Sequence, residues 1–151
     1  MRFVFITWAV IFSSLFLSPV ISGALCVKTS TANLRSGPGT QYEKVWQVYR
    51  FMPLEKVGVS NSKDWYAVRD VDGDVSWIHK SLVTGSFRCA VVEAKVVNVR
   101  TGPGTRYPRR FSEPAKQYDS FRILRTKGAW VKVKDEWNAV GWIHKNFLWI
   151  N

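Results

Sequence analysis

A ten-residue phrase occurs twice in this chain of 151 residues. NLRSGPGTQY covers residues 33–42, and NVRTGPGTRY covers residues 98–107, at an offset of 65. Between residues 33–80 and residues 98–145, 15 of 48 positions are identical, and both segments end in WIHK. Seven identities fall in the first ten positions and eight in the last sixteen. Repetition over this length predicts a duplicated structural unit, which limits the possible architectures more strongly than composition does.

Each copy has the pattern of short β-strands. Apolar residues stand two apart in LEKVGV (54–59), SFRIL (120–124), WYAV (65–68) and WVKV (130–133), which is typical of half-buried strands. The pair Asp72-Gly73 favours a tight hairpin between two of these segments. We therefore predict an all-β fold of two small, strongly bent barrels, each with about five strands.

The boundaries of the two units follow from the repeat. We place the first domain at residues 25–86 and the second at residues 87–151, joined near Thr84-Gly85-Ser86. The middle of the repeat has drifted, and Val57-x-Val59 matches Phe121-x-Ile123 best, which indicates a slip of one residue.

Residues 1–24 are predicted to be a secretory signal peptide. A positive charge at Arg2 precedes a long apolar run, and Ser22-Gly23-Ala24 supplies the small residues that a signal peptidase requires. A retained membrane anchor is the alternative, because the apolar run could span a thin bilayer. Cleavage after Ala24 would make the protein exported, either periplasmic or secreted.

Two cysteines follow the predicted signal. Cys26 and Cys89 each lie just before one copy of the repeated phrase. An even number of cysteines in an exported protein favours a disulfide, so we predict the bond Cys26–Cys89. Two unpaired buried thiols are the alternative.

The chain is basic, with a formal net charge of +11. Residues 25–88 carry nine Lys and Arg against six Asp and Glu, whereas residues 89–151 carry twelve against five. This excess favours an anionic partner such as cell-wall polymer or acidic lipid, while export disfavours nucleic acid. A merely soluble surface without a partner is the alternative.

The repeated motifs resemble those of a known family. NLRSGPGTQY and NVRTGPGTRY resemble the opening strand and loop of bacterial SH3-like domains. WYAVRDVDGDVSWIHKSL and WVKVKDEWNAVGWIHKNFL resemble the closing hairpin and last strand of the same domains. The two copies differ at Ser76, where the second has Gly141, and at Asp72, where the second has Trp137. The resemblance implies five-stranded barrels in an exported envelope protein that holds enzymes on peptidoglycan or reads its peptide stems.

The sequence offers no arrangement typical of catalysis. His79 and His144 are the same position in the two copies, so they form neither a metal cluster nor a catalytic triad. We interpret them as surface residues at strand ends. The cysteines do not occupy equivalent positions, which argues against paired active sites. We therefore predict a non-catalytic protein with no metal and no cofactor.

Binding residues are predicted from exposed aromatic and cationic side chains. Aromatic residues follow each Gly-Pro-Gly loop, arginines flank the second loop, and Trp137 stands at a predicted hairpin tip. Rings can form the walls of a peptide groove, and Arg can bind carboxylates through two hydrogen bonds. The predicted site residues are Tyr42, Trp46, Tyr107, Phe111, Arg106, Arg109, Arg110 and Trp137. Packing within the fold is the alternative for the aromatic residues among them, and for Trp137 this means contact with the first copy or with Trp149.

These features together favour a monomeric binding module for peptidoglycan or its peptide stems. Two weak sites on one rigid body would gain effective concentration on a repetitive polymer. Two alternatives remain open: docking to another envelope protein, and binding of anionic lipid or nucleic acid through the basic second copy.

Overall fold

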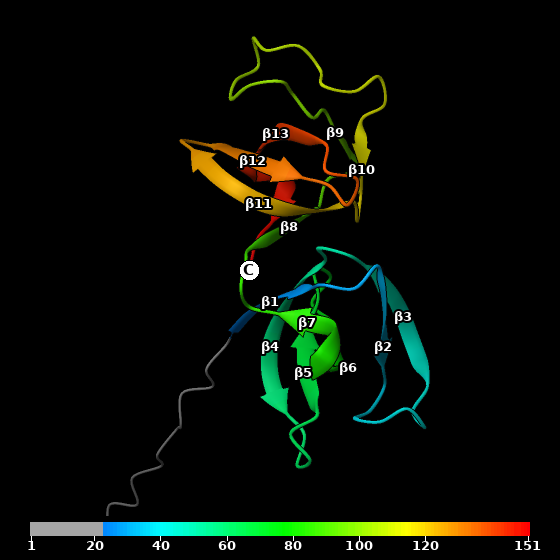
Figure 1. The fold of residues 1–151 in the computed structure, drawn as a ribbon. Coiled ribbons are helices and arrows are strands. Elements are labelled where there is room, and N and C mark those ends of the chain that lie inside the picture. Colours follow the sequence, from blue (N-terminus) through cyan, green and yellow to red (C-terminus); the bar gives the residue numbers. More distant parts are fainter. Residues whose placement is uncertain (1–22) are drawn as a thin grey trace, which may run out of the picture.

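The computed structural model describes residues 23–151 and confirms the all-β class (Figure 1). Within this range the helical segments are η1 (Lys80–Leu82) and η2 (Lys145–Phe147), both 3-10 turns, and neither is long and apolar enough to cross a membrane. The predicted signal peptide lies outside the described residues except for Gly23 and Ala24. These two residues begin strand β1, opposite Lys56 and Glu55.

The first half, residues 23–88, forms one strongly bent antiparallel sheet. Its strand order is β3-β2-β6-β5-β4-β1-β7. The strands are β1 (Gly23–Val27), β2 (Thr31–Arg35), β3 (Lys44–Tyr49), β4 (Pro53–Val59), β5 (Trp65–Arg69), β6 (Val75–His79) and β7 (Val83–Thr84).

The second half, residues 89–151, repeats this order in two pieces. A five-stranded sheet has the order β13-β12-β11-β8-β14, and a smaller sheet pairs β10 with β9. An isolated bridge between Arg100 and Trp142 connects the segment that follows β9 to β13. In the first half, the pair Arg35 and Trp77 connects β2 to β6 in the same way. The strands are β8 (Cys89–Val92), β9 (Val96–Val97), β10 (Ala115–Lys116), β11 (Ser120–Lys127), β12 (Trp130–Lys134), β13 (Val140–His144) and β14 (Leu148–Trp149).

The predicted one-residue slip in the middle of the repeat is wrong. Leu25 pairs with Leu54 in the first half, whereas the equivalent Ala90 pairs with Phe121 in the second. Strand β11 is therefore displaced by two residues relative to β4, in the direction opposite to the predicted slip. The two extra residues lie in segment 110–114, and the β11–β12 hairpin is shorter by two, which restores the offset of 65. The equal lengths of the two copies conceal both changes.

Segment 110–114 also explains why β3 has no full counterpart. In the first half, β2 and β3 pair from Thr31–Tyr49 to Arg35–Lys44. In the second half, β9 and β10 pair at only two positions, and Arg100 then bridges to Arg109. Pro114 lacks a backbone N–H and cannot donate to a neighbouring strand. The chain between these pairs projects as the long yellow-green loop in Figure 1.

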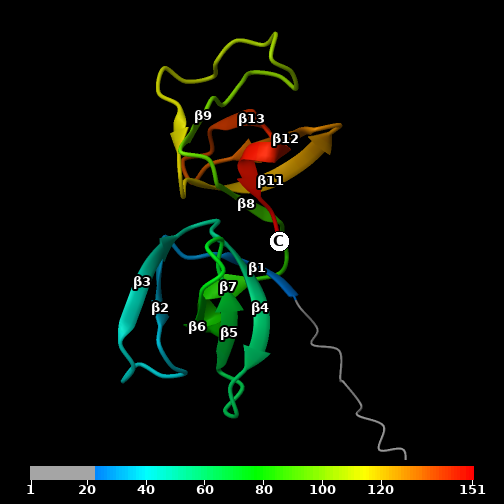
Figure 2. The same ribbon diagram turned by 180° about the vertical axis from the view of Figure 1, so that it is seen from behind.

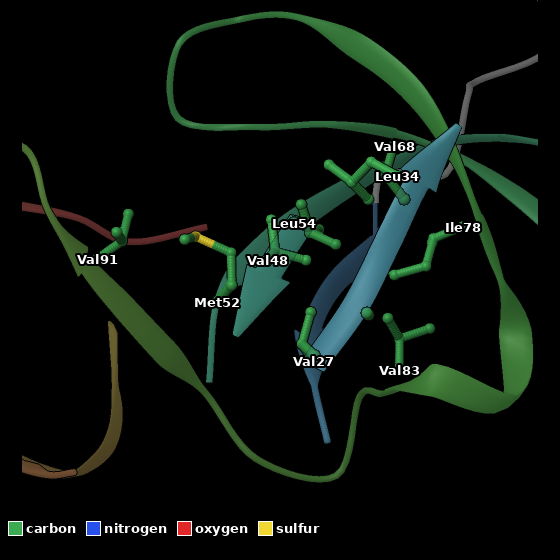
Figure 3. Close-up of a cluster of buried hydrophobic side chains, with 10 residues drawn as sticks. Val27, Leu34, Val48, Met52, Leu54, Val68, Ile78, Val83 and Val91 are labelled. Atoms are coloured by element: carbon green, nitrogen blue, oxygen red, sulfur yellow. The ribbon is translucent and has the colours of Figure 1, made fainter. Parts of the chain in front are cut away.

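Each half has a core of buried aliphatic side chains. Alternate residues of the strands supply it, because successive side chains of a strand point to opposite faces. Fully buried examples are Leu34 and Ile78 in the first half and Ile143 in the second. Val91 of β8 belongs to the core of the first half, and Figure 3 shows Met52 extending toward it.

The two halves are tied together by covalent and polar contacts. Cys26 and Cys89 form the predicted disulfide, with a Cα–Cα distance of 5.9 Å. Ser120 Oγ donates to the Arg50 carbonyl oxygen at 2.7 Å. The Asn151 side-chain amide donates to the Leu25 and Leu54 carbonyl oxygens, and the C terminus lies beside β1 in both views (Figures 1 and 2).

Candidate functional site

The repeated Gly-Pro-Gly loops are each folded around a tyrosine ring. A Cβ atom at Gly37 would overlap the Tyr42 ring, and one at Gly102 would overlap the Tyr107 ring. Glycine is the one residue without a Cβ atom, so the first glycine of each loop lets the ring pack flat on the backbone. This contact explains why Gly and Tyr recur together in the repeated phrase.

An arginine fixes each loop from the side. Arg35 donates to the Thr40 and Tyr42 carbonyl oxygens at 3.0 and 2.7 Å, and Arg100 donates to the Tyr107 carbonyl oxygen at 2.8 Å. Sequence analysis did not single out these arginines, although both stand in the repeated phrase. Their strict recurrence was the signal that could have identified them.

The two histidines cap the 3-10 turns. His79 Nδ1 accepts a hydrogen bond from the Ser81 backbone N–H at 3.3 Å, and His144 Nδ1 accepts from the Asn146 N–H at 3.2 Å. Their rings pack nearly perpendicular to those of Trp65 and Trp130, each with a centroid distance of 5.3 Å. A strand-end position was predicted for both histidines, and their capping role explains why the residue recurs.

A cavity of about 400 Å³ opens beside the second Gly-Pro-Gly loop and is here called the loop groove. The loop, the start of β9 and the turn η2 form its walls. Its lining residues are Val96, Val97, Asn98, Arg100, Thr105, Trp130, His144, Asn146 and Phe147.

Five of these nine lining positions have the same residue in the first half. They are Asn98, Arg100, Thr105, Trp130 and His144, which correspond to Asn33, Arg35, Thr40, Trp65 and His79. The arginine and histidine side chains hold the loop and the turn, as described above. Within residues 23–151, the side chains of the Asn, Thr and Trp in both copies make no hydrogen bond to the protein, so their polar groups are available to a ligand.

The hairpin tips of the two halves share one hydrogen-bonding pattern. Asp70 Oδ1 accepts from the Asp72 and Asp74 N–H groups, both at 3.0 Å. Asp135 Oδ1 accepts from the Trp137 and Ala139 N–H groups at 3.0 and 2.8 Å. The side chain thus closes a turn of the Asx type. Gly73 and Asn138, at equivalent places, both have positive φ, which these two residue types tolerate best.

Asp70 gives the stability of the fold a pH dependence. Burial raises the pKa of this carboxyl group, although its backbone hydrogen bonds oppose the shift. The folded protein then holds the proton more tightly than the unfolded chain, so this contribution to stability is present at low pH. It is lost as the pH rises from the ordinary value of 3.8 through the raised pKa.

We therefore expect Asp70→Asn, which removes the buried charge and keeps an acceptor oxygen, to gain stability relative to the wild type between pH 3 and pH 7. Asp70→Ala loses both hydrogen bonds and is expected to cost about 1–2 kcal/mol. Urea denaturation across this pH range measures both effects. Asp135→Ala removes the same two bonds in the second half and serves as the matched control for the turn. If the unfolding free energy of Asp70→Asn depends on pH as that of the wild type does, the raised pKa of Asp70 would be contradicted.

A larger cleft, of about 580 Å³, lies where the two halves meet and is here called the junction cleft. Segment 110–114, the β12–β13 hairpin tip and the β10–β11 turn form its walls, and Tyr49 and Arg50 of the first half complete it. The lining residues are Tyr49, Arg50, Val99, Phe111, Glu113, Pro114, Ala115, Lys116, Tyr118, Asp119, Ser120, Phe121, Asp135, Glu136 and Trp137.

Two of the predicted site residues, Phe111 and Trp137, come together in the junction cleft. Trp137 is 78% exposed, in agreement with a hairpin tip. Trp46 instead packs edge-on against Tyr118 of the second half, with a centroid distance of 5.5 Å. Tyr118 also donates to the Asp72 carboxylate at 3.0 Å, and this hydrogen bond raises the pKa of Tyr118. Trp46 therefore belongs to the contact between the halves.

The other predicted residues line neither cavity. Tyr42 is exposed over its loop, and Arg109 lies in the backbone bridge to Arg100. Arg106 stacks 5.2 Å from the Tyr107 ring centre, and its hydrogen bond lowers the pKa of Tyr107. Arg110 donates from Nε to the Val140 carbonyl oxygen at 3.3 Å. A ligand-binding role for these residues stays a prediction.

Metal and nucleophile chemistry have few candidates among residues 23–151. No group of three or more His, Cys, Asp or Glu side chains is placed to hold a metal ion in this part of the chain. Both cysteines are consumed in the disulfide.

Comparison with known families supports the sequence resemblance. Residues 30–84 match the family model of the bacterial SH3 domain. This match covers the first half and confirms the predicted family there.

Relatives were found among characterised sequences and solved structures. YrvJ of Bacillus subtilis (strain 168), named as a candidate N-acetylmuramoyl-L-alanine amidase, is 26% identical over 139 residues, or 83% of this chain and 25% of that protein. The chain therefore spans a quarter of that relative's length.

Three solved structures overlay on most of the chain at low scores. NlpC1 from Trichomonas vaginalis has a TM-score of 0.38 at 13% identity, covering 90% of this chain and 47% of its own. An NlpC/P60 family protein from Bacillus cereus ATCC 10987 has a TM-score of 0.36 at 13% identity, covering 85% of this chain and 56% of its own. The endolysin LysPBC5 CBD has a TM-score of 0.34 at 15% identity, covering 89% of this chain and 97% of its own.

Proposed function

We propose, because residues 30–84 match the family model of the bacterial SH3 domain, that the protein is a non-catalytic binding module for cell-envelope material, with peptidoglycan or its peptide stems as the ligand. The whole described chain would then be a tandem pair of SH3-like barrels, with domains at residues 25–86 and 87–151. The shared strand order β6-β5-β4-β1-β7 and β13-β12-β11-β8-β14 supports this reading of the second half.

The recurrence of the residues that line the loop groove is the observation that carries the proposal. The side chains of Asn98, Thr105 and Trp130 make no hydrogen bond within the described part of the protein, and the same three residue types occupy the equivalent positions of the first half. Neutral hydrogen-bonding groups beside an aromatic ring suit an uncharged polar ligand, such as a sugar ring or a peptide backbone. We propose that the equivalent residues of the first half form a second binding site, because two sites on one body gain effective concentration on a polymer with repeating units.

The name of the Bacillus subtilis relative agrees with an envelope role. An N-acetylmuramoyl-L-alanine amidase acts on cell-wall material by its name, and this chain corresponds to a quarter of that protein. We propose that the chain binds the same class of material and does not share the activity that the relative's name gives. An exported monomer, periplasmic or secreted, fits this role.

A binding role also agrees with how the reactive side chains are used. His79 and His144 accept capping hydrogen bonds, and Cys26 and Cys89 are joined in a disulfide. A general base or nucleophile would need one of these groups to be free and beside a partner.

Cosedimentation with purified sacculi tests the proposal at low and high salt. We expect retention that persists at high salt, because the groove ligands are uncharged and screening weakens only ionic contacts. Asn98→Ala/Thr105→Ala should weaken retention at least about tenfold, because one groove and its avidity are lost. Adding Asn33→Ala/Thr40→Ala should remove the remainder.

The matched control is Asn61→Ala/Thr126→Ala, which changes an exposed Asn and an exposed Thr away from both cavities. This control should bind sacculi like the wild type. Absence of retention at any salt concentration would refute the polymer-binding function and favour docking to an envelope protein. Retention that disappears only with salt would favour anionic contacts through the basic second half.

A further inference from the structure

We infer that the junction cleft binds a short peptide segment that carries a free ammonium group and a free carboxylate group. The cleft is distinct from the loop groove, and it has no repeated counterpart in the sequence. The inference rests on the proposed function in one respect, namely that the peptide would come from cell-envelope material.

The cleft follows from the two-residue insertion in the second half. In the first half, β3 runs from Lys44 to Tyr49 and pairs with β2 along its whole length. In the second half, segment 110–114 leaves the sheet between Arg109 and Ala115, so no strand covers this surface. A cleft lies on this side of the sheet, and the buried core residues Val99 and Phe121 are part of its lining.

Acidic side chains are concentrated in this one place. Residues 89–151 contain five Asp and Glu against twelve Lys and Arg. Four of those five acidic residues line the junction cleft, namely Glu113, Asp119, Asp135 and Glu136. A half that is otherwise strongly basic thus presents a locally acidic cavity, which attracts a cationic group.

The carboxylates divide into two kinds. Asp119 and Asp135 accept backbone N–H groups and hold the surrounding turns in place. Glu113 and Glu136 have no hydrogen bond or ion pair to any residue in the range 23–151, so they are free to accept from a ligand. A primary ammonium group, with three donors, fits between such carboxylates.

Aromatic rings complete the ammonium site. Trp137 and Phe111 are 78% and 36% exposed and face the same cleft. Tyrosine, tryptophan and phenylalanine rings attract a cation over their faces. An exposed Trp beside unpaired carboxylates therefore suits an ammonium group on an apolar stem better than it suits a second carboxylate.

Arg50 supplies the opposite charge at the other side of the cleft. It comes from the first half and is part of the cleft lining. A guanidinium group binds a carboxylate through charge-assisted hydrogen bonds. Lys116 adds a second cation to the lining. The two charged regions together match a ligand with both an ammonium and a carboxylate group.

A peptide titration followed by NMR tests the inference on the full chain. The probe is Nα-acetyl-Lys-Ala, which has one side-chain ammonium and one terminal carboxylate. We expect shifts at the Trp137 indole N–H and in segment 110–114. The Nε-acetylated probe, and the probe with an amidated C terminus, should each bind at least about tenfold more weakly, because each lacks one charge-assisted contact.

The variant Glu113→Gln/Glu136→Gln should weaken the parent probe by the same factor and leave the affinity for the Nε-acetylated probe unchanged. Glu93→Gln, which changes the one acidic residue of this half outside the cleft, should bind like the wild type. Equal affinity for the parent and Nε-acetylated probes, shifts confined to other surfaces, or no binding of the parent probe would each overturn the inference. The titration contains no sacculi, so a negative titration would refute peptide binding in the junction cleft without contradicting sacculus binding. Absence of sacculus binding would refute the proposed function without contradicting a positive titration.

Discussion

The variant Cys26→Ala/Cys89→Ala is expected to lose about 4 kcal/mol of unfolding free energy, because the disulfide closes a long loop of the unfolded chain. The two cysteines are 63 residues apart in sequence, and their side chains are 2% and 0% exposed. Alanine replaces each half of the disulfide with a smaller apolar side chain, so the variant introduces no buried polar atom. Guanidinium denaturation of the oxidised wild type and the variant measures the difference.

Reduction of the wild type provides the control for this prediction. The reduced protein and the double variant should have similar midpoints, since both lack the cross-link. A variant as stable as the oxidised wild type would show that the unfolded chain is not constrained by this bond. Two alkylatable thiols in non-reduced protein would contradict the bond itself.

The disulfide also explains how a small two-part chain stays in one arrangement. Cys26 lies in β1, and Cys89 begins β8, so the bond joins the equivalent strands of the two halves. Arg50, which completes the junction cleft, lies beside this connection in the turn before Phe51 and Met52, and Phe51 packs with both cysteines. The site that spans the halves therefore depends on a fixed junction.

Much of the fold was predictable from the repeat, because strand patterns and loop residues recur at one offset. The strands at residues 54–59, 65–68, 120–124 and 130–133 lie within β4, β5, β11 and β12. The hairpin at Asp72-Gly73 is present, with Gly73 at positive φ. Each of these follows from local chemistry, which a single sequence records directly.

The register of the middle strands was not predictable in the same way. A two-residue insertion in segment 110–114 and a two-residue deletion in the β11–β12 hairpin cancel in length. A fixed offset of 65 therefore aligned Trp46 with Phe111, although Trp46 lies in β3 and Phe111 in the loop that replaces it. Only the strand pairing reveals the exchange.

The candidate site was predicted in part, for a related reason. The exposed position of Trp137 was predictable, because an aromatic residue at a hairpin tip has no local structural explanation, and Phe111 is also exposed. The four cleft carboxylates were overlooked because they are scattered along the sequence between Glu113 and Glu136, and the net charge of +11 conceals them. The loop-groove residues were attributed to the fold, and their unpaired polar groups became visible only with the hydrogen bonds.

The core of the first half extends into the second, so Met52→Ala is expected to destabilise the whole protein by about 2–5 kcal/mol. Met52 is 1% exposed and extends toward Val91, which is fully buried and comes from β8 (Figure 3). Removing the long side chain leaves a cavity between the halves and loses the contact with Val91. Urea denaturation, followed by tryptophan fluorescence and by far-ultraviolet circular dichroism, measures the change.

A double-mutant cycle with Val91→Ala separates this shared core from an ordinary cavity. If the two side chains pack together across the junction, the cycle should give a coupling energy of about 0.5–3 kcal/mol. Ile143→Ala, a fully buried change inside the second half, is the control and should be additive with Met52→Ala. Because Val91 joins the cores, both optical probes should report one transition in every variant. A separate early transition of the first half in Met52→Ala, with Val91→Ala additive, would mean that the two halves fold independently and that the junction cleft is not held rigid.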